Sequence, residues 1–571
     1  MMNLKGSMEM EKNNKSKFII ILILFIVVVG VGLWLTKNIG KSSTQINAEN
    51  AKSSLTKLLK GINIKEVEKV KSNNLELGGS DLEDELPEIE KYPLSVEGKG
   101  DINIEIISST EKSSEGTDGW LNEIANNFNK TNYEINGQKA TVSIRPVASG
   151  LAVDYIVSGK HVPQAFTPSN ELWGEMIKAK KVNIEMVEKR IVGNQAGIIL
   201  EKKAYDKFVS KYGEVSLDKI VEATVNDGLA MGYTNPYASS TGLNFLVSTF
   251  NTFDSENLLS DAAISGFQSF QTNVPFVAYT TLQMRDAVNT GVLDAFILEY
   301  QTYYNDAELM RDYVFTPFGV SHNNPMYSIG ELTEEESAVL EAFTEYCLTE
   351  KSQKIANSYG FNKNEEYQNN TEFNGNTLYS AQKVWKEEKD SGKPIIAVFV
   401  ADISGSMDGE PINELRRSLI NASQYINSEN HIGLISFSND VYKNLEIGKF
   451  DLNQRAYFSG AVENLTAGGG TATYDAMLVA LDMILKKKEE IPDAKTMLFL
   501  LSDGKQNRGN SLDSATKILE NLEVPVYTIG YGDEAEQDIL SKISSINEAA
   551  SIVADSDDVV YKLKSLFNSS L

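Results

Sequence analysis

The 571-residue sequence contains one cysteine, Cys347, and only three histidines, His161, His322 and His431. A single cysteine excludes an intrachain disulfide and a zinc site built on cysteines. The histidines lie far apart in the sequence, which argues against a histidine-rich zinc site and against a catalytic triad that depends on histidine. These common zinc and triad chemistries are therefore not expected in this chain.

Basic residues are also scarce relative to acidic ones. Lys and Arg total 53 and Asp and Glu total 79, so the formal net charge is −26. Such an acidic chain is not expected to bind nucleic acid, whereas it suits cation binding and solubility. Its length predicts two or three domains that can bury large cores.

One long apolar run, residues 18–35, carries no charged residue. At about 1.5 Å per residue a helix of this length spans roughly 27 Å, close to the hydrocarbon thickness of a bilayer. No small-x-small cleavage pattern and no lipoprotein cysteine follow it closely. We predict a cytoplasmic tail over 1–17 and a transmembrane helix over 18–35, with the rest of the chain extracellular at the cell membrane. A cleaved signal peptide is the alternative.

Residues 36–98 predict a stalk or linker. Ser, Asn and Lys are frequent at its start, and residues 81–90 are acidic and contain Pro87. Such a segment is expected to be solvated and extended, apart from a short helix with Leu55, Leu58, Leu59 and Ile62 on one face.

Strand-like and helix-like segments alternate over residues 99–370, which predicts an α/β domain. Several of the predicted strands end in Ser, Thr, Asn or Gly just before a helix. Hydroxyl groups and helix N-termini at the carboxyl ends of strands form sites for anions and other polar solutes. The sequence from Thr333 to Glu336 also predicts a capping box at the start of a helix.

This layout resembles that of bacterial extracellular solute-binding proteins, which have a two-lobed periplasmic-binding fold. The resemblance implies a cleft that holds a small polar solute. Glu111 and Glu115 do not suit an oxyanion, so a different solute and a cleft that no longer binds one both remain open. Each hydroxyl also has an alternative role as a helix N-cap. The expected ligand-binding residues are Ser108, Ser109, Ser149, Ser169, Ser239, Ser240, Thr241 and Tyr300.

A polar linker over residues 371–392 precedes the last domain, 393–571. Residues 395–401 form an apolar run, typical of a buried parallel strand, and Asp402, Ser404 and Ser406 follow it at alternate positions. One carboxylate and two hydroxyls just past a strand end direct three oxygens at one point. Oxygen ligands are those that hard divalent cations prefer.

The pattern Asp-x-Ser-x-Ser over 402–406, with Thr471 in a glycine-rich loop and Asp503 after a later strand, resembles the von Willebrand factor A domain. The resemblance implies a doubly wound, mostly parallel sheet and a metal-ion-dependent adhesion site made of Asp402, Ser404, Ser406, Thr471 and Asp503. It also implies Mg²⁺ as the cofactor, with Mn²⁺ and Ca²⁺ as alternatives, and a partner carboxylate as one ligand.

These features predict an anchored extracellular binding or adhesion protein that engages an acidic group of a protein partner through the metal. The alternative is a solute receptor of a transport or sensing system, in which the last domain is a docking module. A metal hydrolase is the least favoured hypothesis, because no histidine neighbours the metal motif and Lys505 is a weak candidate base. We therefore do not expect an enzyme.

Overall fold

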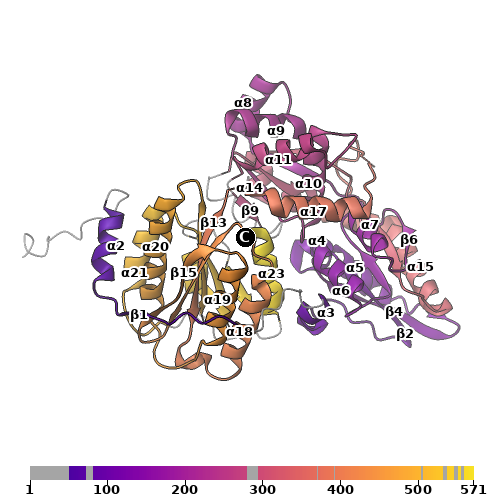
Figure 1. Ribbon diagram of the computed structural model, residues 1–571. Coiled ribbons are helices and arrows are strands. Elements are labelled where there is room, and N and C mark those ends of the chain that lie inside the picture. Colours follow the sequence, from indigo (N-terminus) through magenta and orange to yellow (C-terminus); the bar gives the residue numbers. More distant parts are fainter. Residues whose placement is uncertain are drawn as a thin grey trace, which may run out of the picture.

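The computed structural model describes residues 50–72, 82–274, 276–278, 284, 293–369, 371–390, 393–502, 506–531, 537–545, 551–554 and 558–570. They form two α/β bodies that lie side by side (Figure 1). The predicted tail and transmembrane helix lie outside these residues. Among the described helices, none has the length and apolar character that a membrane crossing requires.

The N-terminal body has two lobes, each built on its own sheet. The chain forms the first sheet, crosses to the second over 189–195 and returns over 318–325. The two crossing segments pair through an antiparallel bridge between Asn194 and His322. The first sheet runs, in spatial order, β3 (Glu134–Ile135), β4 (Gln138–Pro146), β2 (Ile102–Ser108), β5 (Ala165–Thr167), β12 (Met326–Ile329) and β6 (Ile184–Glu188). The second runs β11 (Tyr313–Pro317), β7 (Ala196–Glu201), β10 (Ala295–Glu299), β8 (Met231–Thr234) and β9 (Phe276–Ala278).

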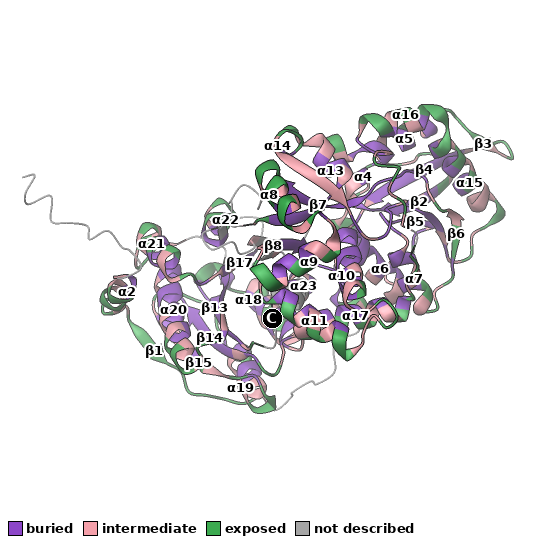
Figure 2. Cartoon of the chain, turned by 90° about the horizontal axis from the view of Figure 1, so that it is seen from above, coloured by how far each residue is buried: buried purple, intermediate pink, exposed green. Residues whose placement is uncertain are grey.

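Helices cover both sheets, and the strands are mostly buried while exposed residues lie mainly on the helices and loops (Figure 2). The predicted capping box is confirmed: Thr333 Oγ1 accepts from Glu336 N at 3.1 Å, and Glu336 Oε2 accepts from Thr333 N at 2.9 Å. The first lobe carries α4 (Thr110–Ser113), η2 (Gly116–Asp118), α5 (Trp120–Asn129), α6 (Ser149–Ser158), α7 (Leu172–Ala179), α15 (Glu334–Leu348) and α16 (Glu350–Ser358). The second carries α8 (Lys202–Tyr212), α9 (Leu217–Asp227), α10 (Ser240–Phe253), α11 (Asp261–Gln271), α13 (Tyr300–Asn305) and α14 (Ala307–Asp312).

The C-terminal body has one seven-stranded sheet in the order β1-β15-β14-β13-β16-β17-β18, in which β1 is the short strand Ile64–Glu66. Strand β13 (Ile395–Asp402) is buried throughout and pairs in parallel with both neighbours. Alternate β13 residues enter the two cores on opposite faces of the sheet, which explains the uninterrupted apolar run. The other strands are β14 (His431–Phe437), β15 (Val441–Lys449), β16 (Lys495–Ser502), β17 (Val526–Tyr531) and β18 (Ser551–Ala554). The helical elements are η4 (Gly405–Met407), α18 (Glu410–Ser423), α19 (Leu452–Glu463), α20 (Thr473–Glu490), α21 (Leu512–Leu522), α22 (Gln537–Ser545) and α23 (Val559–Ser570).

The predicted fold class is thus confirmed for both bodies. Strand β15 is antiparallel to β14, as predicted for a short antiparallel edge strand. It is not the edge strand, however, because β1 (Ile64–Glu66) pairs on its outer side.

The short helix predicted around Leu55 is confirmed, but the solvated stalk predicted over 36–98 is wrong for the residues that the structure describes. Helix α2 (Ala51–Leu59) packs on α20 and α21, and Leu55 is buried there. Strand β1 then extends the C-terminal sheet. This segment folds because its short apolar stripe finds a partner in the distant C-terminal body.

The acidic piece over 81–90 is not extended either. It contains α3 (Leu82–Glu85) and η1 (Ile89–Lys91), and the side chains of Leu86 and Ile89 are buried. The predicted linker over 371–392 contains α17 (Gly375–Glu388), which packs on α7 and α10. Trp385 of α17 is fully buried, and its Nε1 donates to the Tyr233 hydroxyl at 2.7 Å. The N-terminal body therefore extends into this helix.

Charged side chains lie at the contact between the two bodies. Glu85 is 2% exposed, and its carboxylate accepts from the Tyr425 hydroxyl at 2.6 Å and from Lys564 Nζ at 2.5 Å. Asp154 of α6 accepts from the Tyr561 hydroxyl at 3.2 Å. Helices α3 and α6 of one body thus contact α23 and the residues after α18 of the other.

Asp154→Asn is expected to stabilise the protein at neutral pH. Burial raises the pKa of Asp154 to about 6, so the folded state holds this proton more tightly than the unfolded state. The free energy of unfolding should therefore fall as pH rises from about 4 to about 6, and the variant should avoid about 1–2 kcal/mol of that loss. Urea unfolding at pH 4 and pH 7 tests this. An equal difference between variant and wild type at both pH values would contradict it.

Candidate functional site

Asp402 ends the central strand β13 and lies wholly inside the protein, with 0% of its surface exposed. Its Oδ1 accepts from the backbone N–H of Ser404 at 2.8 Å, and its Oδ2 accepts from the Ser502 hydroxyl at 2.7 Å. Ser502 ends the neighbouring parallel strand β16. Two strand ends therefore hold this carboxylate in one orientation.

The two serines of the motif lie next to each other at the start of η4. Ser404 Oγ and Ser406 Oγ are 3.0 Å apart, so both hydroxyls point to one place. The glycine-rich loop is joined to this turn, because Gly405 N donates to Gly469 O at 3.0 Å and Gly468 N donates to Ile403 O at 2.8 Å. Gly469 has φ +92°, a conformation that favours glycine.

Thr471 lies in the loop so joined and is 4% exposed. Asn507 fixes its backbone, since Asn507 Oδ1 accepts from Thr471 N at 3.0 Å and Asn507 N donates to Thr471 O at 3.1 Å. Asn439 similarly accepts from Gly470 N at 2.9 Å through its Oδ1. The structure therefore brings Asp402, Ser404 and Ser406 together beside the loop of Thr471.

The fifth predicted ligand, Asp503, lies outside the described residues. Ser502, Asn507 and Asn439 support the site but were not singled out from the sequence, where only the position of Ser502 at a strand end gave a signal. Within the described residues, no group of three or more His, Cys, Asp or Glu side chains could hold a metal. The grouped donors are instead one carboxylate and hydroxyls, an all-oxygen set that fits a hard divalent cation such as Mg²⁺.

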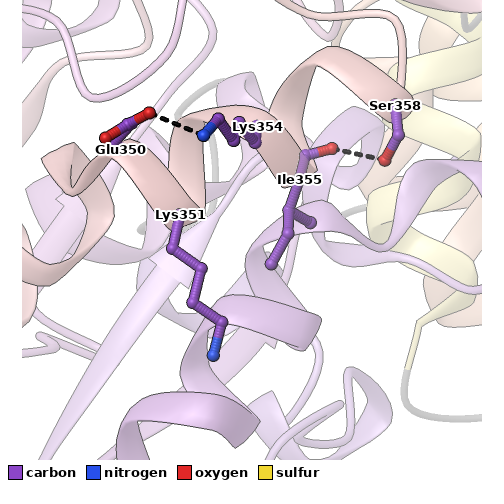
Figure 3. A pocket seen from close by; sticks show the side chains of 5 residues that line it. All are labelled: Glu350, Lys351, Lys354, Ile355 and Ser358. Carbon is purple, nitrogen blue, oxygen red and sulfur yellow. Dashed lines mark hydrogen bonds and ion pairs between the residues drawn. The ribbon is translucent and has the colours of Figure 1, made fainter.

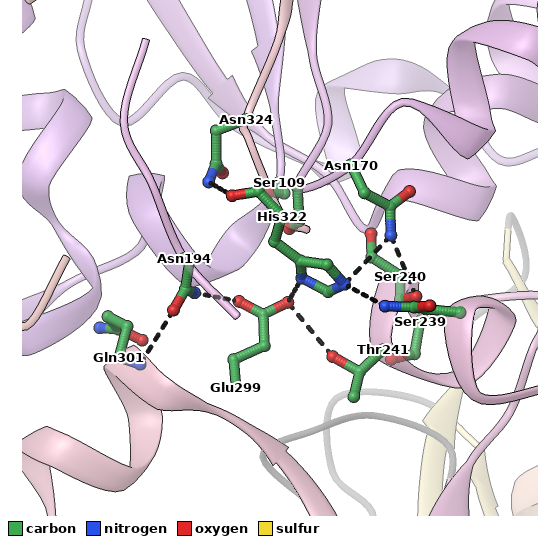
Figure 4. Close-up of polar contacts among 12 residues, drawn as sticks. Ser109, Asn170, Asn194, Ser239, Ser240, Thr241, Glu299, Gln301, His322 and Asn324 are labelled. Carbon is green, nitrogen blue, oxygen red and sulfur yellow. Dashed lines mark hydrogen bonds and ion pairs between the residues drawn. The ribbon is translucent and has the colours of Figure 1, made fainter. Parts of the chain in front are cut away.

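A second polar cluster lies between the two lobes of the N-terminal body, around Glu299 at the end of β10 (Figure 4). Glu299 is 1% exposed. Its Oε2 accepts from Asn194 Nδ2 at 2.6 Å, and its Oε1 accepts from the Thr241 hydroxyl at 3.2 Å. The Glu299 carboxylate thus accepts hydrogen bonds from Asn194 of a crossing segment and from Thr241 in the first turn of α10.

His322 also contacts Glu299, and its tautomer follows from the neighbouring amide. Asn244 is oriented by the backbone of Val320, whose N–H donates to Oδ1 at 2.8 Å and whose carbonyl accepts from Nδ2 at 2.9 Å. This Nδ2 also lies 3.2 Å from His322 Nε2, as does Asn170 Nδ2. Nε2 must then accept, so Nδ1 carries the hydrogen and donates to Glu299 Oε1 at 3.1 Å.

The predicted cleft serines lie close to this cluster and are hydrogen-bonded to other protein groups. Ser240 Oγ donates to Ser149 Oγ at 3.3 Å and accepts from Trp173 Nε1 at 2.8 Å, which joins α10 to α6 and α7. Ser169 Oγ donates to Ser109 Oγ at 3.1 Å. The contacts of Ser240 join the two lobes directly, whereas the Ser169–Ser109 contact links two strand ends of the first lobe.

The remaining predicted residues have structural partners as well. Ser239 is the N-cap of α10 and accepts from Gly242 N at 3.3 Å, the alternative role expected for a hydroxyl there. Ser108 donates to Ser109 O at 3.3 Å. Tyr300 begins α13, and its ring stacks on Tyr304 with centroids 6.3 Å apart.

The charged pair that follows Ser109 is strongly perturbed. Burial raises the pKa of the Glu111 carboxyl, and the nearby charge of Glu299 raises it further. Burial lowers the pKa of Lys112, whose Nζ donates to Ser109 Oγ and Thr167 O, both at 2.7 Å. Two carboxyl groups thus share this region with one ammonium group, which does not suit an anionic solute.

An open pocket of about 460 Å³ is lined by residues of α16 (Figure 3). Its polar side chains bond within the helix: Lys354 pairs with Glu350 at 2.6 Å, and the Ser358 hydroxyl donates to Ile355 O at 2.7 Å. None of the residues predicted for a site lines it.

Two protein families match separate parts of the chain. Residues 397–568 match the von Willebrand factor type A domain, and residues 113–362 match the bacterial extracellular solute-binding protein family. The first match contains Asp402, Ser404, Ser406 and Thr471, and the second contains Glu299 and the polar cluster around it.

Curated relatives match about a third of the chain. An uncharacterized protein of Synechocystis sp. is 26% identical over 185 residues, which are 32% of this chain and 43% of the relative. An inter-alpha-trypsin inhibitor heavy chain of Sus scrofa is 30% identical over 193 residues, which are 32% of this chain and 20% of the relative. The chain therefore spans less than half the length of these relatives.

Solved structures are similar to each body separately. A von Willebrand factor type A protein from Catenulispora acidiphila is 19% identical with a TM-score of 0.28, over 31% of this chain and 42% of that one. A putative extracellular solute-binding protein from Bordetella parapertussis is 14% identical with a TM-score of 0.38, over 50% of this chain and 99% of that one.

Proposed function

The chain joins a bacterial extracellular solute-binding domain to a von Willebrand factor type A domain, and we propose that it is an extracellular adhesion protein anchored in the cell membrane. In this proposal, the C-terminal domain binds an acidic group of a protein partner through a divalent cation. The apolar run over 18–35 supplies the anchor.

The observation that carries the proposal is the convergence of Asp402, Ser404 and Ser406 beside the loop of Thr471. Ser404 and Ser406 would hold the cation through their hydroxyls, and Asp402 would supply negative charge. Asp503 would supply a second carboxylate. A bound Mg²⁺ would retain positive charge and exchangeable positions for a partner's carboxylate. The bonds from Ser404 N and Ser502 keep the Asp402 carboxylate from rotating, so the site is organised before the cation arrives.

This proposal is one of binding rather than catalysis. Hydroxyl, amide and backbone groups hold Asp402 and the loop of Thr471 in place, and groups of these kinds are poor general bases near neutral pH. His322, the imidazole held in a polar cluster, lies in the other domain.

Capture of acidic peptides tests the proposal. We expect the purified protein to retain aspartate-containing peptides in Mg²⁺ and to release them in EDTA, while the matched asparagine peptides fail to bind. Retention that is equal in Mg²⁺ and EDTA would contradict metal-dependent adhesion.

A solute receptor is the second candidate function. The gathered polar groups of Ser109, Ser169, Thr241 and Glu299 favour it, because they lie where two lobes meet. The direct bonds between the lobes disfavour an anion there. A thermal-shift screen of amino acids, cations and oxyanions against the full chain distinguishes the candidates. A solute receptor requires one class to raise the melting temperature.

A further inference from the structure

The first sheet of the N-terminal body has an open edge at β6. This strand is last in the sheet order and pairs with β12 alone among the described strands. Gly330 N donates to Asn183 O at 2.9 Å, so the antiparallel alternation directs the main-chain groups of Ile184 and Met186 away from β12. An edge of this kind is a template for another extended chain.

A groove of about 830 Å³ lies between this edge and α15. Apolar side chains are exposed on both of its sides: Met186 of β6 is 40% exposed and Leu348 of α15 is 42% exposed. An exposed apolar pair beside an unpaired strand edge has the arrangement of a surface that binds extended peptides.

The charges along the groove have one sign. The residues that line it include five glutamates and neither lysine nor arginine. No ion pair within the described part of the chain joins any of these five to a basic side chain. They are Glu185, Glu188, Glu331, Glu341 and Glu345.

We propose that the β6–α15 groove is a docking site for a basic, extended segment of another protein, which adds to the sheet as a strand beside β6. The glutamates of the groove favour lysine and arginine side chains in the partner by charge complementarity. Main-chain hydrogen bonds to the open edge of β6 require an extended backbone. Met186 and Leu348 contact apolar side chains that lie between the basic ones. This site is separate from Asp402, so binding needs no divalent cation.

Fluorescence anisotropy of the full chain with a labelled heptapeptide of alternating lysine and valine tests the proposal. We expect saturable binding that persists in EDTA, and no binding of the matched glutamate–valine peptide. The double variant Glu341→Lys, Glu345→Lys should weaken binding at least about tenfold. The control Glu256→Lys, Glu520→Lys changes the net charge equally at exposed sites elsewhere and should leave affinity within about twofold.

A second variant tests strand addition as distinct from charge attraction. Met186→Pro removes an outward N–H without removing a bond to β12, and it should weaken peptide binding more than Met186→Ala does. Circular dichroism and melting curves establish that each variant is folded. Equal weakening by the groove and control charge variants, or equal affinities for Met186→Pro and Met186→Ala, would overturn the proposal. Displacement of the peptide by spermine at the same charge concentration would also do so.

Discussion

Asp402→Ala is expected to abolish the stabilisation of the protein by Mg²⁺ and Mn²⁺. A ligand at one hundred times its dissociation constant stabilises a folded protein by about 2.7 kcal/mol. Metal binding to the folded wild type should therefore raise its melting temperature. Asp402 is the described carboxylate of the site, and its removal also frees the Ser404 N–H and the Ser502 hydroxyl that it holds. Calorimetric titration of the purified protein with each metal, alongside melting curves, measures both effects.

The controls separate the metal site from general loss of charge. Asp482→Ala removes a carboxylate that pairs with Lys486 on α20, and it should leave metal binding unchanged. Ser502→Ala keeps the predicted ligands and removes the bond that orients Asp402, so it should weaken binding by about 10–100-fold. If Mg²⁺ raises the melting temperature of Asp402→Ala as much as that of the wild type, Mg²⁺ does not bind at the site of Asp402.

The core of the C-terminal domain follows from the sequence because its signals are local. The apolar run that ends at Asp402 became the central strand, and the hydroxyls placed after it lie together in the structure. The order of the motif assigned Thr471 to the site, and the bond from Gly405 N to Gly469 O joins the loop of Thr471 to the turn, although these residues are distant in the chain. A strand end and a glycine-rich loop are strong patterns because the sheet brings such ends to one edge.

The predicted stalk failed for the opposite reason. The side chains of residues 64–66 are all exposed. Their strand therefore pairs with β15 through main-chain hydrogen bonds, which a hydrophobic pattern in the sequence cannot predict. Glu85 likewise has the sequence context of a solvated acid, yet it is buried because Lys564 and Tyr425 of the C-terminal body contact it. Such contacts are tertiary, and composition alone cannot predict them.

The hydroxyls predicted for the cleft lie near the place where the two lobes meet. The sequence did not predict the protein groups to which they bond. Glu299 meets Asn194, which is 105 residues away, and Thr241, which is 58 residues away. Nothing in the local sequence indicates that a carboxylate at the end of β10 will turn toward these groups. The result matters for function, because donors that a solute anion would need already bond to Glu299.

His322→Ala tests whether this network holds the lobes together. The substitution removes the donor to Glu299 Oε1 and the acceptor for Asn170 and Asn244, all of which are buried. Buried polar groups that lose a partner cost about 1–3 kcal/mol each, and remaining contacts reduce the sum, so we expect a loss of about 2–4 kcal/mol in the free energy of unfolding. Urea unfolding, followed by tryptophan fluorescence, measures it.

Asn323→Ala provides the matched control, since Asn323 neighbours His322 but donates from a half-buried site to Glu171, at 3.2 Å. It should cost less than about 1 kcal/mol. Glu299→Gln keeps the shape of the cluster and tests the charge separately. If the carboxylate itself keeps anions out, this variant should gain affinity for an oxyanion such as sulfate while His322→Ala loses stability. If Glu299→Gln binds sulfate no better than the wild type, the carboxylate joins the lobes but does not select the solute.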